Sequence, residues 1–247
     1  MVRTLLLIFA HPDDETFLAG GSACKYAGEG VRVVLVSATR GESGKAGDPP
    51  LCSSEELPAL REQEMRRAAA ILGIAEVHLL GYHDRELAAA PPDQIREQLV
   101  TIIRCHQPSV VVSFDPNGGN AHPDHIAISR FAADAVSAAA DPRWFPSAGP
   151  PHSTARLVWP TGRGPWRLVR EPDIAAHPGV DFTIDVSACC ERKAAALRAH
   201  ATQHQSADRN FFSQPDRDRL LGVEFFRQAI GPRLPHRPLE DLFDGLD

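Results

Sequence analysis

Residues 3–38, RTLLLIFAHPDDETFLAGGSACKYAGEGVRVVLVSA, hold two apolar runs on either side of a segment rich in helix-forming residues. The first run (residues 3–10) is rich in Leu and Ile and the second (residues 31–38) in Val, as is typical of buried strands. Residues 17–29 between them end in Gly28-Glu29-Gly30, which is a helix stop signal. A strand, a helix and a second strand in this order predict a crossover unit with two parallel strands.

The same alternation continues through the first half of the chain. Helices are expected at residues 55–72, 93–105 and 123–140, and strands at residues 76–80 and 109–114. Strands that alternate with helices predict a mainly parallel sheet with helices on both faces. The predicted fold class is therefore α/β, of a Rossmann-like type.

The second half of the chain is less regular. Residues 142–151 and 160–179 are rich in Pro and Gly and are expected to form long loops. A strand is expected at residues 180–186, and helices at residues 187–203 and 220–229. We predict one domain over residues 1–247, with long loops over the edge of the sheet that carries the site. These loops are residues 43–54, 86–92 and 143–178.

The composition argues against several classes of protein. The 26 Lys and Arg residues against 32 Asp and Glu residues give a net charge of −6, unlike a general nucleic-acid or membrane-surface binder. The apolar run at residues 5–10 is too short for a secretion signal, and a spanning helix needs about 20 apolar residues. The five cysteines are odd in number and include no CxxC pair, which indicates reduced thiols. We expect a cytoplasmic protein with neither a nucleic-acid nor a membrane partner.

Two short segments combine His, Pro and Asp between an expected strand and an expected helix. Residues 10–15 read AHPDDE, and residues 120–125 read NAHPDH after a Gly-rich loop. Ligands of open α/β sheets bind outside the carboxyl ends of the strands, where both segments fall. A helix start alone would also explain Asp13 as a cap and the Pro at the first helical position. The occurrence of two such segments favours a shared site.

The residue types in these segments suit a divalent metal. His11 and Asp14 are three residues apart, as are His122 and His125. Two His and one carboxylate are a common catalytic zinc set, with one position open to water. Such an ion lowers the pKa of bound water to around 7, and a nearby carboxylate and imidazole can then move protons. The spacing does not decide between His122 and His125 as the third ligand.

These motifs resemble those of the PIG-L/LmbE-like zinc-dependent N-acetylglucosaminyl de-N-acetylases. The two signatures stand here as AHPDDE, followed by TFLAGG, and as HPDH. The resemblance covers about residues 3–230 and leaves residues 231–247 as a C-terminal tail. Supporting matches are TRGE at residues 39–42, the helix at 61–73, LGYHD at 80–84 and KAAALRAHATQ at 193–203.

The resemblance implies one zinc ion per chain, with other divalent metals as alternatives, held by His11, Asp14 and His125. It implies that the bound water attacks an N-acetyl group on the 2-amino position of a glucosamine unit, giving a free amine and acetate. The implied partner is therefore a small-molecule amino sugar. Because family members often assemble, a homo-oligomer is a further expectation.

The resemblance also implies the acid–base residues. Asp13 looks like the general base that activates the water. His122 looks like the imidazole that stabilises the oxyanion and protonates the leaving amine, and Asp124 is similar to the acidic neighbour that sets the charge of that imidazole.

Five further residues are candidates for substrate contact: Glu42, Arg61, Asp84, Asn120 and His200. The alternatives are a helix charge for Arg61, a turn residue for Glu42 and Asp84, and a plain helix residue for His200. Asn120 stands where thiol-biosynthetic members of the family often place a Tyr.

Other functions remain as alternatives. One is an amidase that removes a larger acyl group from an amino-sugar conjugate, and another is a non-catalytic carbohydrate-binding domain. A nucleotide-binding enzyme is disfavoured because no GxGxxG opens the first helix.

Overall fold

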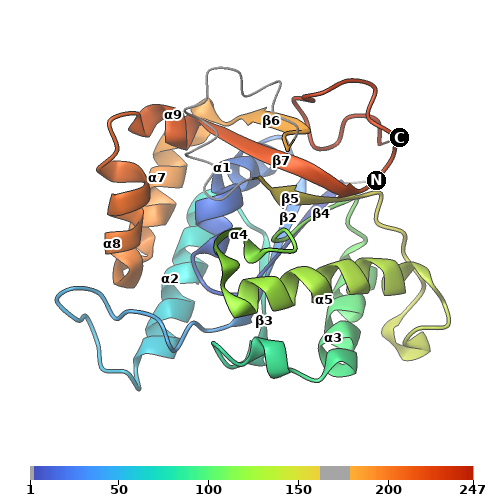
Figure 1. Ribbon diagram of the computed structural model, residues 1–247, viewed down its shortest axis with the longest axis horizontal. Coiled ribbons are helices and arrows are strands. Elements are labelled where there is room, and N and C mark those ends of the chain that lie inside the picture. Colours follow the sequence, from blue (N-terminus) through green and yellow to red (C-terminus); the bar gives the residue numbers. More distant parts are fainter. Residues whose placement is uncertain (1–2, 162–178, 247) are drawn as a thin grey trace.

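The computed structural model describes residues 3–161 and 179–246, built around one seven-stranded sheet (Figure 1). The strand order is β3-β2-β1-β4-β5-β7-β6. The first five strands of this order are parallel to one another, and β7 runs antiparallel to both β5 and β6. The strands are β1 (Thr4–Phe9), β2 (Arg32–Thr39), β3 (Glu76–Tyr82), β4 (Val110–Val112), β5 (Arg156–Pro160), β6 (Phe182–Asp185) and β7 (Val223–Ile230). The prediction of a mainly parallel α/β sheet is confirmed.

Helices cover both faces of this sheet. On one side α1 (Asp14–Gly28), α2 (Leu57–Leu72) and α7 (Cys190–Ala199) contact one another, and on the other α3 (Pro92–His106) contacts α5 (Pro123–Ala140) (Figure 1). Every residue of β1 is buried, as expected for a parallel strand covered on both faces. The shorter described elements are α4 (Gly118–Ala121), α8 (His204–Ala207), α9 (Arg217–Gly222), a π-helical turn at Asp208–Phe212 and 3-10 turns at Leu87–Ala89, Pro146–Ala148, Ser187–Cys189 and Ala201–Gln203.

The direction of winding reverses between β1 and β4. From β1 the chain proceeds outward through β2 to β3, whereas β4 lies on the other side of β1 and leads to β5. Ligands of doubly wound sheets bind in the crevice beside such a reversal, outside the carboxyl ends of the strands. The AHPDDE segment follows β1 and the NAHPDH segment follows β4, so the fold brings both segments to this crevice.

The prediction of a helix at residues 220–229 is wrong, because α9 ends at Gly222 and β7 follows. Val223, Phe225 and Phe226 suit a strand, and β7 pairs with β5 and β6, which lie far from it in the sequence. Long-range pairing of this kind decides the structure of a segment whose local sequence is ambiguous.

Other expectations for the second half are met only in part. The helix expected at residues 187–203 is interrupted at His200, which has φ −81° and ψ 64°. Residues 142–151 form the expected loop around a 3-10 turn, but residues 162–178 of the second expected loop lie outside the described residues.

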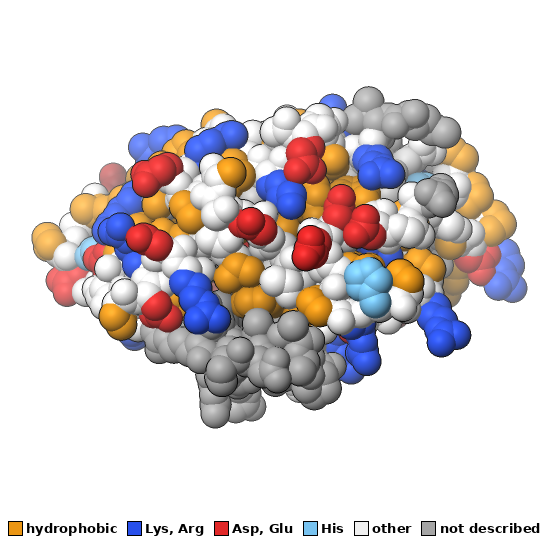
Figure 2. Space-filling model, turned by 90° about the horizontal axis from the view of Figure 1, so that it is seen from above, with side chains coloured by type: hydrophobic (Ala, Val, Ile, Leu, Met, Phe, Trp, Pro, Cys, Tyr) orange, Lys and Arg blue, Asp and Glu red, His pale blue; other side chains and the backbone are white. Residues whose placement is uncertain are grey.

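The surface mixes charges of both signs. Figure 2 shows a face on which Lys and Arg side chains are interspersed with Asp and Glu side chains. Among the described helices, none is both long and apolar enough to cross a membrane.

Candidate active site

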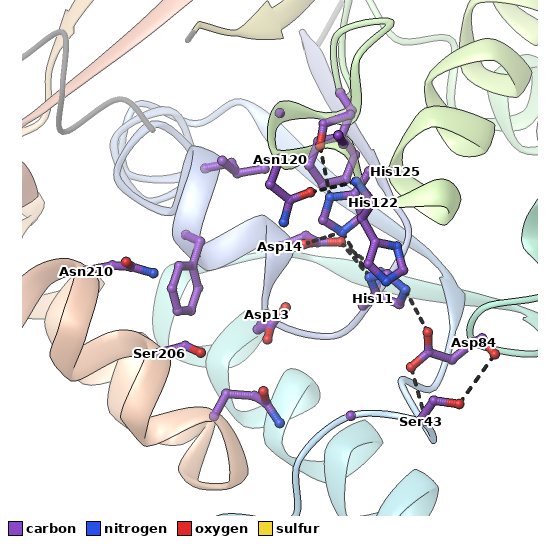
Figure 3. Close-up of a pocket in the computed structure, with 18 of the residues that line it drawn as sticks. His11, Asp13, Asp14, Ser43, Asp84, Asn120, His122, His125, Ser206 and Asn210 are labelled. Carbon is purple, nitrogen blue, oxygen red and sulfur yellow. Dashed lines mark hydrogen bonds and ion pairs between the residues drawn. The ribbon is translucent and has the colours of Figure 1, made fainter. Parts of the chain in front are cut away.

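A cavity of about 700 Å³ opens beside the carboxyl ends of β1 and β4 (Figure 3). Residues of both His-Pro-Asp segments line it, together with the loop after β3 and the segment around α8. The lining includes His11, Asp13, Asp14, Asp84, His122 and His125. The structure therefore brings together segments that lie more than 100 residues apart.

The side chains of His11, Asp14 and His125 form a small triangle, in which the two imidazoles face different oxygens of the Asp14 carboxylate. His11 Nδ1 lies 3.1 Å from His125 Nε2, and the Asp14 carboxylate oxygens lie 3.5 Å from His11 Nδ1 and 3.4 Å from His125 Nε2. Zinc bonds of about 2.0–2.1 Å in a tetrahedron place neighbouring ligand atoms about 3.3 Å apart. The triangle therefore fits a tetrahedral ion with one position left open.

The other ring nitrogens of the two imidazoles have acceptors that fix their tautomers. His125 Nδ1 lies 3.1 Å from the Gly118 carbonyl, which can only accept a hydrogen bond. His11 Nε2 lies 3.1 Å from Asp84 Oδ1 and 3.3 Å from Asp124 Oδ2. Both rings are thus oriented by their outer nitrogens, as metal-binding imidazoles usually are, and their inner nitrogens converge.

The charges around His11 also suit a cation. Burial lowers the pKa of His11, but hydrogen bonds to Asp124, Asp14 and Asp84 outweigh it and raise the pKa to about 12. Burial opposes ionisation of Asp14, yet His125 and His11 hold its pKa at about 2. Hydrogen bonding to His11 likewise helps to lower the pKa of Asp84 to about 2 against the effect of burial, and two buried carboxylates of this kind need a positive charge beside them.

His122 leaves a second candidate set. Its ring offers a nitrogen within 4.8 Å of nitrogens of His11 and His125, so the three imidazoles also form a metal-ligating group. The Asp14 set combines two imidazoles with one carboxylate, as is common in catalytic zinc sites. In the structure His122 caps α5, because its Nδ1 accepts from the Asp124 backbone N–H at 3.2 Å. In the neutral imidazole of His122, the ring proton is therefore on Nε2.

The Asp124 carboxylate takes a different place from the one the resemblance implies. It accepts from the backbone N–H groups of Arg85 (2.5 Å) and Leu87 (3.2 Å), and it lies against His11. Its link to His122 is made by its backbone N–H instead. Asp124 therefore ties the loop after β3 to His11.

Asp13 lies beside the triangle in a strained conformation. Its φ of 112° is rare for any residue other than Gly, and such strain concentrates at functional sites. Burial raises its pKa to about 7, although the guanidinium of Arg61 acts to lower it. A carboxylate with a pKa near neutrality suits a general base.

Arg61 binds three acceptors around Asp13. It donates to the Gly41 carbonyl (2.7 Å), the Pro12 carbonyl (2.5 Å) and the Asp13 carboxylate (3.2 Å). Its side chain is buried, yet it reaches the cavity lining. Arg61 thus holds the loops after β1 and β2 together and positions Asp13.

Comparison with known proteins identifies the family. The family described as "PIG-L: GlcNAc-PI de-N-acetylase" matches residues 6–136. The chain is 33% identical to the 1D-myo-inositol 2-acetamido-2-deoxy-alpha-D-glucopyranoside deacetylase of Streptomyces scabiei, over 98% of this chain and 89% of that one. It is 34% identical to the enzyme of the same name from Geodermatophilus obscurus, over 99% and 98% of the two chains. The chain belongs to the PIG-L family.

A solved structure supports the fold of this PIG-L family member. The N,N'-diacetylchitobiose deacetylase of Pyrococcus horikoshii superposes with a TM-score of 0.71, at 24% identity, over 92% of this chain and 84% of that one. The family and the Rossmann-like fold that the motifs indicate are therefore both confirmed.

The five expected substrate contacts of this PIG-L chain separate into two groups. Asp84, Asn120 and Arg61 are among the described residues that line the cavity, whereas Glu42 and His200 are not. Glu42 lies 2.9 Å from His83, on the outer side of the site.

His200 lies fully buried behind Asp13. Its Nε2 is 2.9 Å from Glu15 Oε1, and the other oxygen of Glu15 accepts the Asp13 backbone N–H at 3.0 Å. Burial lowers the pKa of His200, but the charge of Glu15 outweighs it and raises the pKa. Glu15 therefore links His200 to the backbone of Asp13.

One wall of the cavity was not expected from the sequence. It is lined by Gln203 at the end of a 3-10 turn, by Ser206 of α8, and by Arg209 and Asn210 of the π-helical turn that follows. Figure 3 shows Ser206 and Asn210 on the side of the cavity opposite His122. Residue types at these positions carry no motif, because polar side chains are equally common on exposed helices. A π-helical turn is a frequent feature of functional sites, but only the structure reveals it.

Proposed function

We propose that this PIG-L chain is a zinc-dependent deacetylase of a 2-acetamido-2-deoxy-glucoside joined to inositol. The observation that carries the proposal is the triangle of His11, Asp14 and His125 beside Asp13 in an open cavity. Relatives that carry the name of this activity match nearly the whole chain. The products would be the free amino sugar conjugate and acetate.

Zinc is the proposed ion because two imidazole nitrogens and one carboxylate oxygen are a common zinc set. When bound, such an ion lowers the pKa of a water molecule and polarises the acetamide carbonyl. The three proposed ligands would hold it at the floor of the cavity.

The remaining side chains supply the proton transfers. Asp13 takes a proton from the attacking water, while Arg61 holds the Asp13 carboxylate in place. His122 donates from Nε2 to the developing oxyanion of the acetamide. The C–N bond then breaks as His122 gives its Nε2 proton to the departing amine, and the proton that Asp13 took from the water replaces it on the imidazole.

The proposed substrate class also suits the size of the cavity. A volume of about 700 Å³ lies in the range of sites that enclose ligands larger than one sugar ring. The polar wall at Ser206 and Asn210 offers a hydroxyl and an amide to a second, hydroxyl-rich ring. We propose that the inositol ring lies against this wall.

Acetate release tests the proposal directly. The purified enzyme is incubated with the N-acetylglucosamine–inositol conjugate, with free N-acetylglucosamine, with N,N'-diacetylchitobiose and with an inositol conjugate that carries a larger acyl group. We expect the highest kcat/KM on the acetylated inositol conjugate. Faster release of the larger acyl group would make the chain an amidase instead, and the absence of turnover on all four would refute the proposal.

A further inference from the structure

A second cluster of metal-ligating side chains lies at the other end of the sheet. Glu76 and His78 are the first and third residues of β3, so they share one face of that strand. His106 is the last residue of α3. The cavity lies at the carboxyl ends of the strands, whereas Glu76 begins the edge strand β3. This cluster is therefore separate from the candidate active site.

The ligand-type atoms of this cluster converge. His78 Nε2 lies 2.9 Å from His106 Nε2 and 3.0 Å from Glu76 Oε1, and the third separation, from Glu76 Oε1 to His106 Nε2, is 3.8 Å. These separations scatter around the value of about 3.3 Å that a tetrahedral zinc ion requires. The two rings meet at 61°, so they point at a common place and do not stack.

The surroundings hold the cluster in place. Arg32 pairs with Glu76 Oε2 at 2.8 Å, which leaves Oε1 to face the two imidazoles. The side chain of His106 is only 6% exposed, whereas His78 and Glu76 reach solvent. Burial lowers the pKa of His106, which keeps its nitrogen available as a ligand near neutral pH. One side of the cluster is therefore open to water as a further ligand.

An ordinary hydrogen-bonded cluster explains this arrangement less well. Two Nε2 atoms that face each other share a single proton in any hydrogen bond between them, and both also lie near the same carboxylate oxygen. A dication at the point of convergence satisfies all three atoms at once.

We propose that Glu76, His78 and His106 bind a second transition-metal dication of the Zn²⁺ type, which fastens the end of α3 to the edge strand β3. Imidazole nitrogen favours zinc, copper or nickel, whereas Mg²⁺ and Ca²⁺ prefer oxygen ligands. The role is structural, because the cluster lies away from the cavity. The proposal does not depend on the substrate, and only the expected count of two ions rests on the zinc proposed for the active site.

Metal counting on the holoenzyme tests this site. The protein is equilibrated with Zn²⁺ and freed of loosely bound ions by gel filtration, and the bound zinc is measured per chain. We expect two ions in the unchanged protein and one in His78→Gln and in His106→Gln. Loss of either imidazole should weaken zinc binding at this site. The loss should exceed the roughly 10–100-fold caused by removing a residue that only hydrogen-bonds to a metal ligand. Mg²⁺ in place of Zn²⁺ should not fill the second site.

A matched control comes from the pair of His83 and Glu42. His83 Nδ1 lies 2.9 Å from Glu42 Oε1, but this pair contains only one imidazole. His83→Gln should leave the zinc count at two. Zn²⁺ should also raise the Tm of the holoenzyme, and this rise should disappear in the two cluster variants. Unchanged deacetylase activity of His78→Gln and His106→Gln would show that both variants are folded. Glu76→Gln is a third variant, at the most exposed of the three positions.

Two results would overturn the inference. One is a single zinc ion per chain in the unchanged protein at excess Zn²⁺ that is retained in His78→Gln and His106→Gln. The other is a second ion that persists in His78→Gln, His106→Gln and Glu76→Gln alike, since that ion would be bound elsewhere. Neither result would affect the proposed deacetylase function, which is tested by acetate release.

Discussion

At the scale of single residues, a single substitution tests the role of Asp13 as the general base. Asp13→Asn keeps its size but removes the base. We expect kcat to fall by about 10²–10⁴-fold, the usual contribution of a general base, while the bound metal is retained. Acetate release and metal analysis on the same preparation check both outcomes. Loss of the metal in this variant would mean that Asp13 is a ligand.

A comparison of His122 with His125 decides the third ligand. His122→Ala should lower kcat by about 10²–10³-fold, as the loss of an oxyanion donor does, and keep the metal. His125→Ala should lose the metal, since its Nε2 belongs to the triangle. The reverse pattern of metal contents would assign the third position to His122.

The sequence predicts the two His-Pro-Asp segments because each follows a strand end, and strand ends of a parallel sheet converge. It does not predict the contact of Asp84 with His11, because the two are 73 residues apart and no spacing rule relates them. The choice between His122 and His125 also requires three-dimensional distances, because both lie on one turn.

At the scale of elements, the loop after β2 controls the position of Arg61. A Cβ added at Gly41 would collide with the Arg61 guanidinium, and the φ of Gly41 is +66°. Gly41→Ala should therefore displace Arg61 from Asp13 and lower kcat/KM by roughly 10²-fold, as a misplacement of about 1 Å can.

Gly30→Ala is the matched control for this change. Gly30 has a φ of +84° but open space around its Cβ position, so Ala there adds backbone strain without touching Arg61. Its kcat/KM should stay near that of the unchanged enzyme. Equal losses of activity in both variants would attribute the effect to strain alone.

The segment of α8 and the π-helical turn should set the preference for the second ring of the substrate. Asn210→Ala removes an amide from the cavity wall, and we expect KM for the inositol conjugate to rise about 2–10-fold, the equivalent of one hydrogen bond. Activity on free N-acetylglucosamine should not change. Gln205→Ala, in the preceding helix α8 but bonded to Asp48, is the control. A KM increase for both substrates would contradict this role of the wall.

The elements that the sequence misassigns are those whose structure depends on distant partners. The expected helix ends at His200, because the His200 ring is bound to Glu15. Thr202, in the turn that follows, donates two hydrogen bonds to Glu64. Periodicity within residues 187–203 contains no information about those partners. By contrast, β1 and β2 contain the apolar runs at residues 5–9 and 33–36, which predict buried strands from the local sequence alone.

At the scale of the whole molecule, residues 231–246 complete the core, although the sequence presents them as a tail. Leu239, Leu242 and Phe243 are buried, and the Leu242 and Asp244 carbonyls accept hydrogen bonds from the buried Arg156. Tyr26 donates to the Asp241 carboxylate and accepts the Leu242 backbone N–H. The last residues therefore anchor the sheet at β5 and the end of α1.

Substitution of Leu242 measures how much stability this anchoring provides. Leu242→Ala should lower the free energy of unfolding by about 2–5 kcal/mol, because Leu242 is fully buried and its removal leaves a cavity. Deletion of residues 231–247 should cost more, since it also strips Arg156 of acceptors. Leu51→Ala, at a residue that is 54% exposed, should change stability by no more than about 0.5 kcal/mol. Urea denaturation of the three variants tests this, and a loss in Leu242→Ala as small as that in Leu51→Ala would show that the segment only rests on the surface.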